Sequence, residues 1–229
     1  MARRGWFTRE TGWERRAAVA GVVFVVLALI WAILRTSGPG GGDSHAEITK
    51  FFSDSGDRAR FGAAGWVMAA AGLFLLWFLA GLRVLLRRAE GEPGRLAGLA
   101  FGAGVVMVAL LFAKNSIHPA FAGVYDYADD FKLDPNTYQI LDSIWFWLIA
   151  QEVMAGGVLV AASSAIALRT ALFPRWFGWA GIVVAALCFL AVPLFLAPAI
   201  LLLAWILVAS ILMWTRAAAA SPAAAGITA

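Results

Sequence analysis

The chain has 229 residues, of which 62% are hydrophobic and 14% are charged, and its formal net charge is +4. A soluble domain of this size carries about 25% charged residues. Here the apolar residues form long runs with almost no charge, which excludes an ordinary soluble domain and predicts a membrane protein. Because Arg residues flank these runs, the basic balance indicates membrane topology and argues against nucleic-acid binding.

Six apolar runs predict an all-α fold, a polytopic transmembrane bundle of six helices. The runs cover residues 17–34, 61–82, 96–113, 140–168, 177–192 and 199–214. At about 1.5 Å per residue each can cross a hydrocarbon core of about 30 Å, although the last two are short. Residues 1–16 then form a cytoplasmic N-terminal segment, 17–216 the transmembrane domain, and 217–229 a low-complexity, disordered tail.

The last two runs are separated by a short segment between two prolines, Pro193 and Pro198. Proline interrupts helices, so we expect a tight turn there and a helical hairpin around it. The alternative is one kinked or re-entrant segment, which would leave five spans.

The distribution of Lys and Arg predicts the orientation of the bundle. With six spans, one side of the membrane holds 12 of these residues and the other side holds 6. Cytoplasmic loops carry the excess of Lys and Arg. We therefore expect a multi-pass protein of the plasma membrane with both termini in the cytoplasm.

Two outward loops carry local signals. In the first, a glycine-rich stretch precedes Ser44 and Glu47, which are spaced as a capping box, and Ile48, Phe51 and Phe52 follow at helical spacing. This pattern predicts a short helix on the outer membrane surface over residues 44–53. The second loop is expected over residues 115–139, and the sequence Asp134-Pro135 is typical of the start of the next helix.

Several segments resemble a family of uncharacterised six-span membrane proteins of high-GC Gram-positive bacteria. The similar segments are the run at 74–83 (FLLWFLAGLR), the turn at 89–95 (AEGEPGR), the start of the third span at 97–104 (AGLAFGAG) and the block at 168–179 (LRTALFPRWFGW). The resemblance covers most of the chain. It implies a membrane location and six spans, and it implies neither an activity nor catalytic residues.

Glu152 is the main candidate for chemistry. It lies about twelve residues into the fourth predicted span, roughly 18 Å along the helix axis, with no charge between it and Arg169. A carboxylate at that depth is costly unless it is paired, protonated or hydrated. We therefore expect a neutral carboxyl that serves either as a proton donor or as a hydrogen-bonding group that joins neighbouring helices. Lys114, at the outer end of the third span, is the nearest cation by topology. We expect it to turn outward to water.

The residues around Glu152 complete the predicted site. Asp142, Trp145, Glu152 and Gly156 share one face of the fourth span by their three- and four-residue steps. Asp142 is the second catalytic candidate. The candidate pocket residues are Trp145, Gln151, Gly156, Trp77, Trp205 and Lys114.

Other patterns predict no metal, cofactor or phosphate site. His45 and His118 fall in different predicted loops without the spacing of metal ligands, so solvated or capping roles are expected for both. Haem is not expected because neither histidine falls inside a predicted span. Gly94, Gly98 and Gly102 form a four-residue ladder that predicts close helix packing.

Three functions fit these patterns. The first is a helical bundle that binds a lipid or small apolar molecule from the bilayer, or supports a partner membrane protein. The second is a membrane-embedded enzyme that uses Glu152 as a general acid on an isoprenoid-like substrate, with aromatic faces stabilising a cation. The third is a proton-coupled transporter in which Glu152 carries the proton.

Overall fold

The computed structural model describes residues 2–36, 38–128, 130–190 and 196–219, and these residues contain helices and no strand. The predicted all-α fold class is confirmed. The helices in chain order are α1 (Ala2–Arg35), α2 (His45–Ser53), α3 (Ser55–Glu90), α4 (Arg95–Tyr127), α5 (Pro135–Thr170), α6 (Arg175–Leu190) and α7 (Leu196–Ala219).

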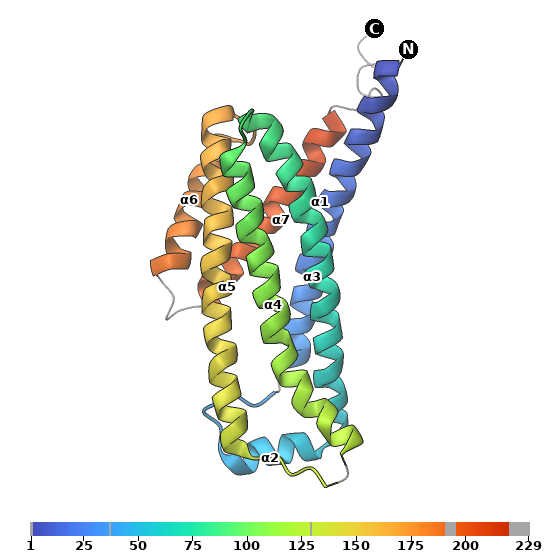
Figure 1. Cartoon of the computed structure of the whole chain (residues 1–229), viewed down its shortest axis with the longest axis vertical. Helices are drawn as coiled ribbons and strands as arrows, with labels where there is room; N and C mark the ends of the chain where they lie inside the picture. Colours follow the sequence, from blue (N-terminus) through green and yellow to red (C-terminus); the bar gives the residue numbers. More distant parts are fainter. Residues whose placement is uncertain (1, 37, 129, 191–195, 220–229) are drawn as a thin grey trace.

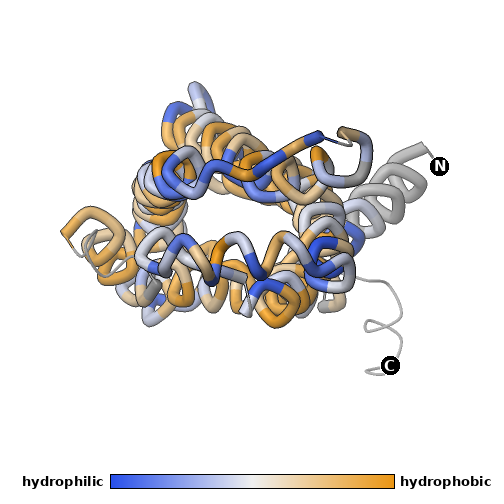
Figure 2. Tube along the Cα trace, turned by 90° about the horizontal axis from the view of Figure 1, so that it is seen from below, coloured by the Kyte–Doolittle hydropathy of each residue, from blue (hydrophilic) through white to orange (hydrophobic). Residues whose placement is uncertain are grey.

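The long helices form a bundle with two distinct ends. α1, α3, α4 and α5 run along it, α7 crosses at an angle, and α2 lies across one end (Figure 1). We call this the α2 end, and we call the opposite end, where α1 begins and α7 ends, the terminal end. α3 packs against α1 and α4, α4 against α5, α5 against α6, and α7 against α1. Seen along the axis, the helices are arranged in a ring (Figure 2). Buried hydrophobic side chains of these helices pack together as one cluster.

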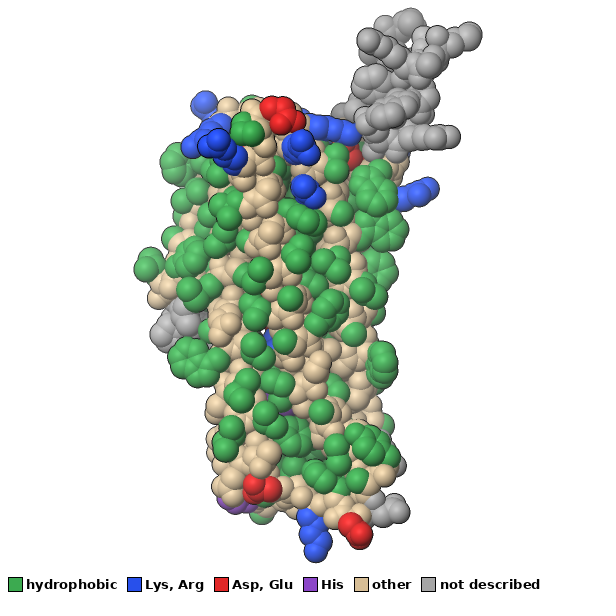
Figure 3. Space-filling view, viewed as in Figure 1, with side chains coloured by type: hydrophobic (Ala, Val, Ile, Leu, Met, Phe, Trp, Pro, Cys, Tyr) green, Lys and Arg blue, Asp and Glu red, His purple; other side chains and the backbone are tan. Residues whose placement is uncertain are grey.

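Within the part of the chain that the structure describes, five helices are long and apolar enough to cross a membrane. They are Gly12–Arg35 within α1, all of α3, Arg95–Tyr125 within α4, all of α5, and Ala197–Ala218 within α7. α6 is apolar but has only 16 residues. On the face shown in Figure 3, hydrophobic side chains cover the middle of the bundle and charged side chains gather at its two ends.

Three predicted boundaries differ from the structure or lie outside it. Residues 2–16 belong to α1, so the N-terminal segment continues the first span as helix. Pro198 lies in the first turn of α7, whereas Pro193 and most of the predicted turn are outside the described residues. The tail is helical up to Ala219, and 220–229 are outside the described residues.

The predicted loop over residues 115–139 is wrong in its first half, because α4 continues through Pro119 to Tyr127. A proline inside a helix removes one backbone hydrogen bond and crowds the preceding turn. Contacts with α3 offset this cost. A Cβ on Gly65 would lie 2.6 Å from Pro119 Cγ, so Pro119 fits closely against a residue without a side chain. Asn115 Nδ2 also donates to the Gly65 carbonyl oxygen at 2.8 Å.

The helix-start signals at Ser44 and at Asp134 are confirmed. Ser44 caps α2, and Ser44 and Glu47 form the predicted capping box. The apolar side of α2 packs on the bundle. Its residues Ile48, Phe51 and Phe52 join Phe61, Phe121, Ala122, Leu133 and Tyr138 in a small hydrophobic core at the α2 end. Asp134 caps α5, and the pKa of this carboxyl lies below its ordinary value because Thr137 and Asn136 donate hydrogen bonds to it.

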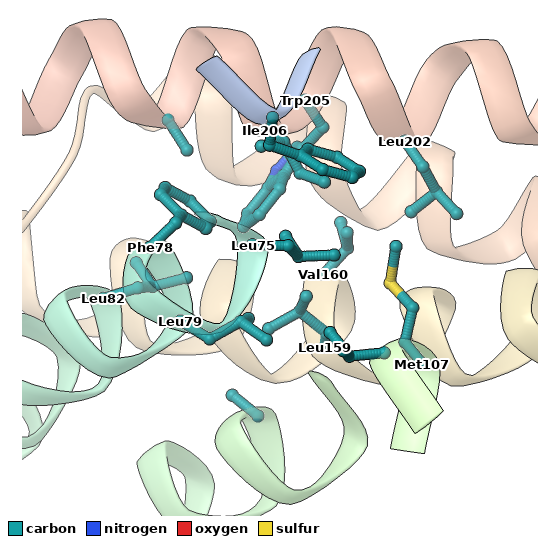
Figure 4. Packing of buried hydrophobic residues seen from close by; sticks show 14 of the residues in the cluster. Leu75, Phe78, Leu79, Leu82, Met107, Leu159, Val160, Leu202, Trp205 and Ile206 are labelled. Carbon is teal, nitrogen blue, oxygen red and sulfur yellow. The ribbon is translucent and has the colours of Figure 1, made fainter. Parts of the chain in front are cut away.

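The larger hydrophobic core joins α1, α3, α4, α5, α6 and α7. Its labelled residues in Figure 4 are Leu75, Phe78, Leu79, Leu82, Met107, Leu159, Val160, Leu202, Trp205 and Ile206. The expected close packing at the glycine ladder is wrong at Gly98 and Gly102, where a Cβ would meet nothing within 4 Å. Gly94 instead serves the turn between α3 and α4, because its φ of +67° lies in the left-handed region that favours glycine.

Candidate functional site

A buried ion pair lies near the middle of the bundle, between α4 and α5. Lys114 Nζ is 2.6 Å from Glu152 Oε2, and the two side chains are only 9% and 10% exposed. Glu152 is central in α5, a helix of 36 residues. The ammonium and carboxylate groups face each other at this distance, so the contact is an ion pair. The expectation that Lys114 turns outward to water is therefore wrong. Inside the bundle each charge offsets part of the other's desolvation cost.

A second cluster lies one helical turn closer to the α2 end, because His118 follows Lys114 by four residues on α4. Arg35 Nη1 of α1 is 2.8 Å from His118 Nδ1, and His118 Nε2 is 2.9 Å from Asp142 Oδ1 of α5. Arg35 Nη2 is 3.9 Å from the same carboxylate oxygen. The histidine, only 2% exposed, thus bridges a cation and an anion.

The partners of His118 determine its tautomer. An arginine side chain only donates hydrogen bonds and stays protonated. Nδ1 must therefore accept from Arg35, and the ring proton must sit on Nε2, from which it is donated to Asp142. In this arrangement His118 is neutral, and the two clusters together carry two positive and two negative charges.

Aromatic rings connect the two clusters. The Arg35 guanidinium carbon lies 4.2 Å from the ring centre of Trp145, 5.2 Å from that of Phe61 and 5.9 Å from that of Trp31. Trp31 is also 5.7 Å from Lys114 Nζ. Because an aromatic face attracts cations, Trp31 and Trp145 hold both basic side chains inside the bundle.

The glycine-rich segment between α1 and α2 is bound to the same end of α5. The Gly41 amide donates to Asp142 Oδ2 at 2.9 Å, and the Tyr138 hydroxyl donates to the Pro39 carbonyl oxygen at 2.6 Å. Tyr138 is fully buried. These bonds hold the segment against the cluster of Arg35, His118 and Asp142.

The structure brings together only some of the residues predicted for the site. Glu152, Lys114, Asp142 and Trp145 all belong to the two clusters. Gly156, one turn beyond Glu152, is buried against Leu202 and Met107.

Three predicted pocket residues lie elsewhere. Gln151 is exposed on the outside of α5. Trp77 is 39% exposed and pairs with Trp13 of α1 at 5.9 Å between ring centres. Trp205 is buried and stacks on Phe177 of α6 at 5.3 Å. These residues do not form one pocket with Glu152.

A groove lies on the outer face of the bundle between α3 and α4, in the half nearest the α2 end. Its volume is about 740 Å³. Small residues form its walls, namely Ala59, Gly62, Ala63, Ala69, Ala120 and Gly123. Trp66 and Tyr127 line it and are 81% and 77% exposed. Arg58, Asn115 and Ser116 add polar groups to its lining.

The floor of this groove separates it from the buried clusters. Gly65, Asn115 and Pro119 line the groove and also a small internal cavity that reaches Arg35 and His118. The cavity volume is about 10 Å³, which is room for about one water molecule. In the half of α4 nearest the α2 end, one side of the helix therefore lines the groove and the opposite side faces the charged clusters.

Comparison with known proteins gives no relative for this fold or site. No family model, no curated protein and no solved structure matches the chain. Within the described residues, no group of three or more His, Cys, Asp or Glu side chains is placed to hold a metal ion.

Proposed function

We propose that this protein is a multi-pass membrane protein that binds a lipid or lipid-like apolar molecule in the groove between α3 and α4. The observation that carries the proposal is the groove itself. Its volume of about 740 Å³ lies within the range of roughly 300–1,000 Å³ typical of small-molecule sites. Its walls are apolar and faced by small side chains, so an acyl chain can approach both helix backbones closely.

The groove also offers polar groups to the head of an amphipathic molecule. Arg58 and Tyr127 lie near the α2 end of α3 and α4, while Asn115 and Ser116 lie further along α4. A chain packed against the glycine and alanine walls would leave its polar end near Arg58. This division of apolar and polar lining is typical of sites that bind amphipathic ligands.

In this proposal the two charged clusters position α4. The clusters fix the half of α4 nearest the α2 end against α1 and α5. The side of α4 that faces away from the clusters stays available as a wall of the groove. The pairing of Glu152 with Lys114 also weighs against the general-acid hypothesis, which needs a neutral carboxyl. A carboxylate held by an ammonium group is a poor proton donor.

A lipid-binding measurement on the purified protein tests the proposal. Gly62→Leu places a side chain in the groove without a clash, because a Cβ at Gly62 would meet nothing within 4 Å. Gly102→Leu is the matched control, since it makes the same change outside the groove at a position where an added Cβ also meets nothing within 4 Å. Crosslinking of a photoactivatable phospholipid to residues 115–127 should fall several-fold in the first variant only. Equal labelling of both variants would refute the proposal.

Proton-coupled transport is a second candidate, favoured by the series of titratable side chains inside the bundle. Tyr138, Asp142, His118, Lys114 and Glu152 follow one another from the α2 end towards the middle. Intramembrane groups of this kind mark proton paths in transporters. Reconstituted vesicles with an imposed pH gradient should then lose the gradient faster than vesicles that hold the double variant Lys114→Met with Glu152→Leu, which removes the titratable pair without stranding a charge. Identical rates would exclude this candidate.

The proposed topology has six crossings with both termini in the cytoplasm of a plasma-membrane protein. Five crossings would leave the start of α1 and the end of α7 on opposite sides, whereas both lie at the terminal end (Figure 1). The 12-to-6 distribution of Lys and Arg supports a cytoplasmic terminal end. Reporter fusions after Arg95 and Arg175 should read cytoplasmic, and an external reading after Arg175 would refute the six-crossing topology.

A further inference from the structure

A crevice between α1, α3 and α7 at the terminal end has the features of a second ligand site. Its volume is about 430 Å³. The apolar part of its wall consists of Val19, Ala20, Phe74, Trp77 and Trp214. Two cations, Arg15 and Arg16, also line it, one helical turn before Val19 and Ala20 on α1. An apolar wall thus continues directly into a basic one.

The basic part of the crevice is held in place by its neighbours. Arg15 Nη2 donates to the Ala217 carbonyl oxygen at 3.3 Å, and its guanidinium carbon lies 5.7 Å from the Trp214 ring centre. The adjacent Arg16 is exposed. Glu14, the acid next to them in sequence, is paired with Arg88 of α3 at 2.7 Å. Among the described residues that line the crevice, the charged side chains are the two cations.

The apolar wall is partly exposed near the basic end of the bundle, where a bilayer crossed by α1 and α3 would have the boundary between its headgroups and acyl chains. Val19, Trp77 and Trp214 are 45%, 39% and 45% exposed. Tryptophan is enriched at this boundary because its ring is apolar and its N–H is polar. Arginine side chains bind phosphate groups with two parallel hydrogen bonds. The crevice thus combines an acyl-chain surface with phosphate-binding groups in the order in which a phospholipid presents them.

We propose that this crevice binds an anionic phospholipid from the leaflet at the terminal end, with the phosphate at Arg15 and Arg16 and one acyl chain along Val19 and Trp77. The proposal requires that the bundle crosses a membrane, but it does not depend on the groove between α3 and α4. A zwitterionic lipid fits less well, because its cationic headgroup meets the two arginines.

Native mass spectrometry of the detergent-solubilised protein, titrated with phosphatidylglycerol and with phosphatidylcholine, measures this preference. Replacing both cations (Arg15→Gln with Arg16→Gln) should weaken phosphatidylglycerol binding by about tenfold or more, since each charge-assisted contact is lost. Phosphatidylcholine binding should fall much less, because its cationic headgroup already opposes the two arginines. The matched control replaces Arg169 and Arg175 by Gln. It removes the same charge from exposed positions at the same end of the bundle, outside the crevice.

Two further variants separate the site from a general charge effect and from the α3–α4 groove. Gly12→Phe keeps both cations and fills the crevice, and a Cβ there would meet nothing within 4 Å. It should weaken phosphatidylglycerol binding as well, whereas Gly62→Leu should not. Unchanged binding in the double Arg variant or in Gly12→Phe overturns the proposal. An equal loss of phosphatidylglycerol binding in the control that replaces Arg169 and Arg175 also overturns it. So does a competition experiment in which glycerol phosphate, which has no acyl chains, displaces bound phosphatidylglycerol as well as free phosphatidylglycerol does.

Discussion

Removing one partner of the Lys114–Glu152 pair should destabilise the bundle strongly. Both side chains are about nine-tenths buried, so a single change leaves the other charge stranded. A stranded group can become neutral at pH 7, and each unit of difference between pH 7 and its ordinary pKa then costs about 1.36 kcal/mol. The cost is roughly 4.6 kcal/mol for Lys and roughly 3.7 kcal/mol for Glu. Both figures fall within the 3–5 kcal/mol typical of a broken buried pair. Glu152→Leu, which strands the ammonium, should therefore be the more harmful change.

The double variant provides the discriminating comparison. Replacing Lys114 by Met and Glu152 by Leu removes both charges, so it should recover most of the loss. Unfolding in mixed micelles can be followed by tryptophan fluorescence, with Lys132→Met as the control at an exposed lysine. The reasoning would be refuted if both single variants unfolded within about 1 kcal/mol of the native protein, the range typical of solvent-exposed pairs. A double variant as unstable as the worse single variant would also refute it.

Three further predictions concern the α2 end and the groove floor. Thr49→Pro should unfold α2 because proline removes a backbone donor inside this nine-residue helix, and spin labels along residues 45–53 should then become mobile. Asp134→Asn should make the first turn of α5 insensitive to acid. In the native protein the lowered pKa of Asp134 means that its capping contribution is complete above the ordinary carboxyl pKa and is lost as the pH falls through the lowered value. The chemical shift of the Thr137 amide should report this loss in the native protein alone. Gly65→Val should separate α3 from α4 by contact with Pro119 and lower thermal stability, whereas Gly62→Val should not.

Much of the fold could be predicted because its signals are local. Apolar runs predicted the long helices, and the capping box at Ser44 and Glu47 predicted α2. The continuation of α4 through Pro119 could not be predicted in this way. It depends on Gly65 and Asn115, which bring α3 and α4 together over fifty residues of sequence. The local rule that proline interrupts a helix predicts instead that the helix ends before Pro119.

The candidate site was only partly predictable for the same reason. The shared face of Asp142 and Glu152 follows from their spacing on one helix, but their partners Arg35, His118 and Lys114 come from α1 and α4. Lys114 and His118 are four residues apart, which was a usable signal that both point to one side of α4. The third predicted span stops at residue 113, before both Lys114 and His118, so the predicted spans do not place the two residues on one helix.

Residues selected by depth alone were placed least well. Gln151 precedes the buried Glu152, but one step of about 100° around the helix turns it outward. Trp77 and Trp205 both lie well inside predicted apolar runs, yet Trp77 is 39% exposed against Trp13 and Trp205 is buried against Phe177. Depth along a helix does not determine which face a residue occupies.

An experimental structure of the protein in lipid nanodiscs tests the central claim, that the groove between α3 and α4 is a ligand site, most directly. We predict an elongated density along Gly62, Ala63 and Ala120, with its polar end near Arg58. The same preparation of Gly62→Leu should lack this density and keep the Lys114–Glu152 contact. A native structure in which α3 and α4 close over the groove, or in which the groove holds no more lipid density than the open surface around Gly102, would contradict the claim.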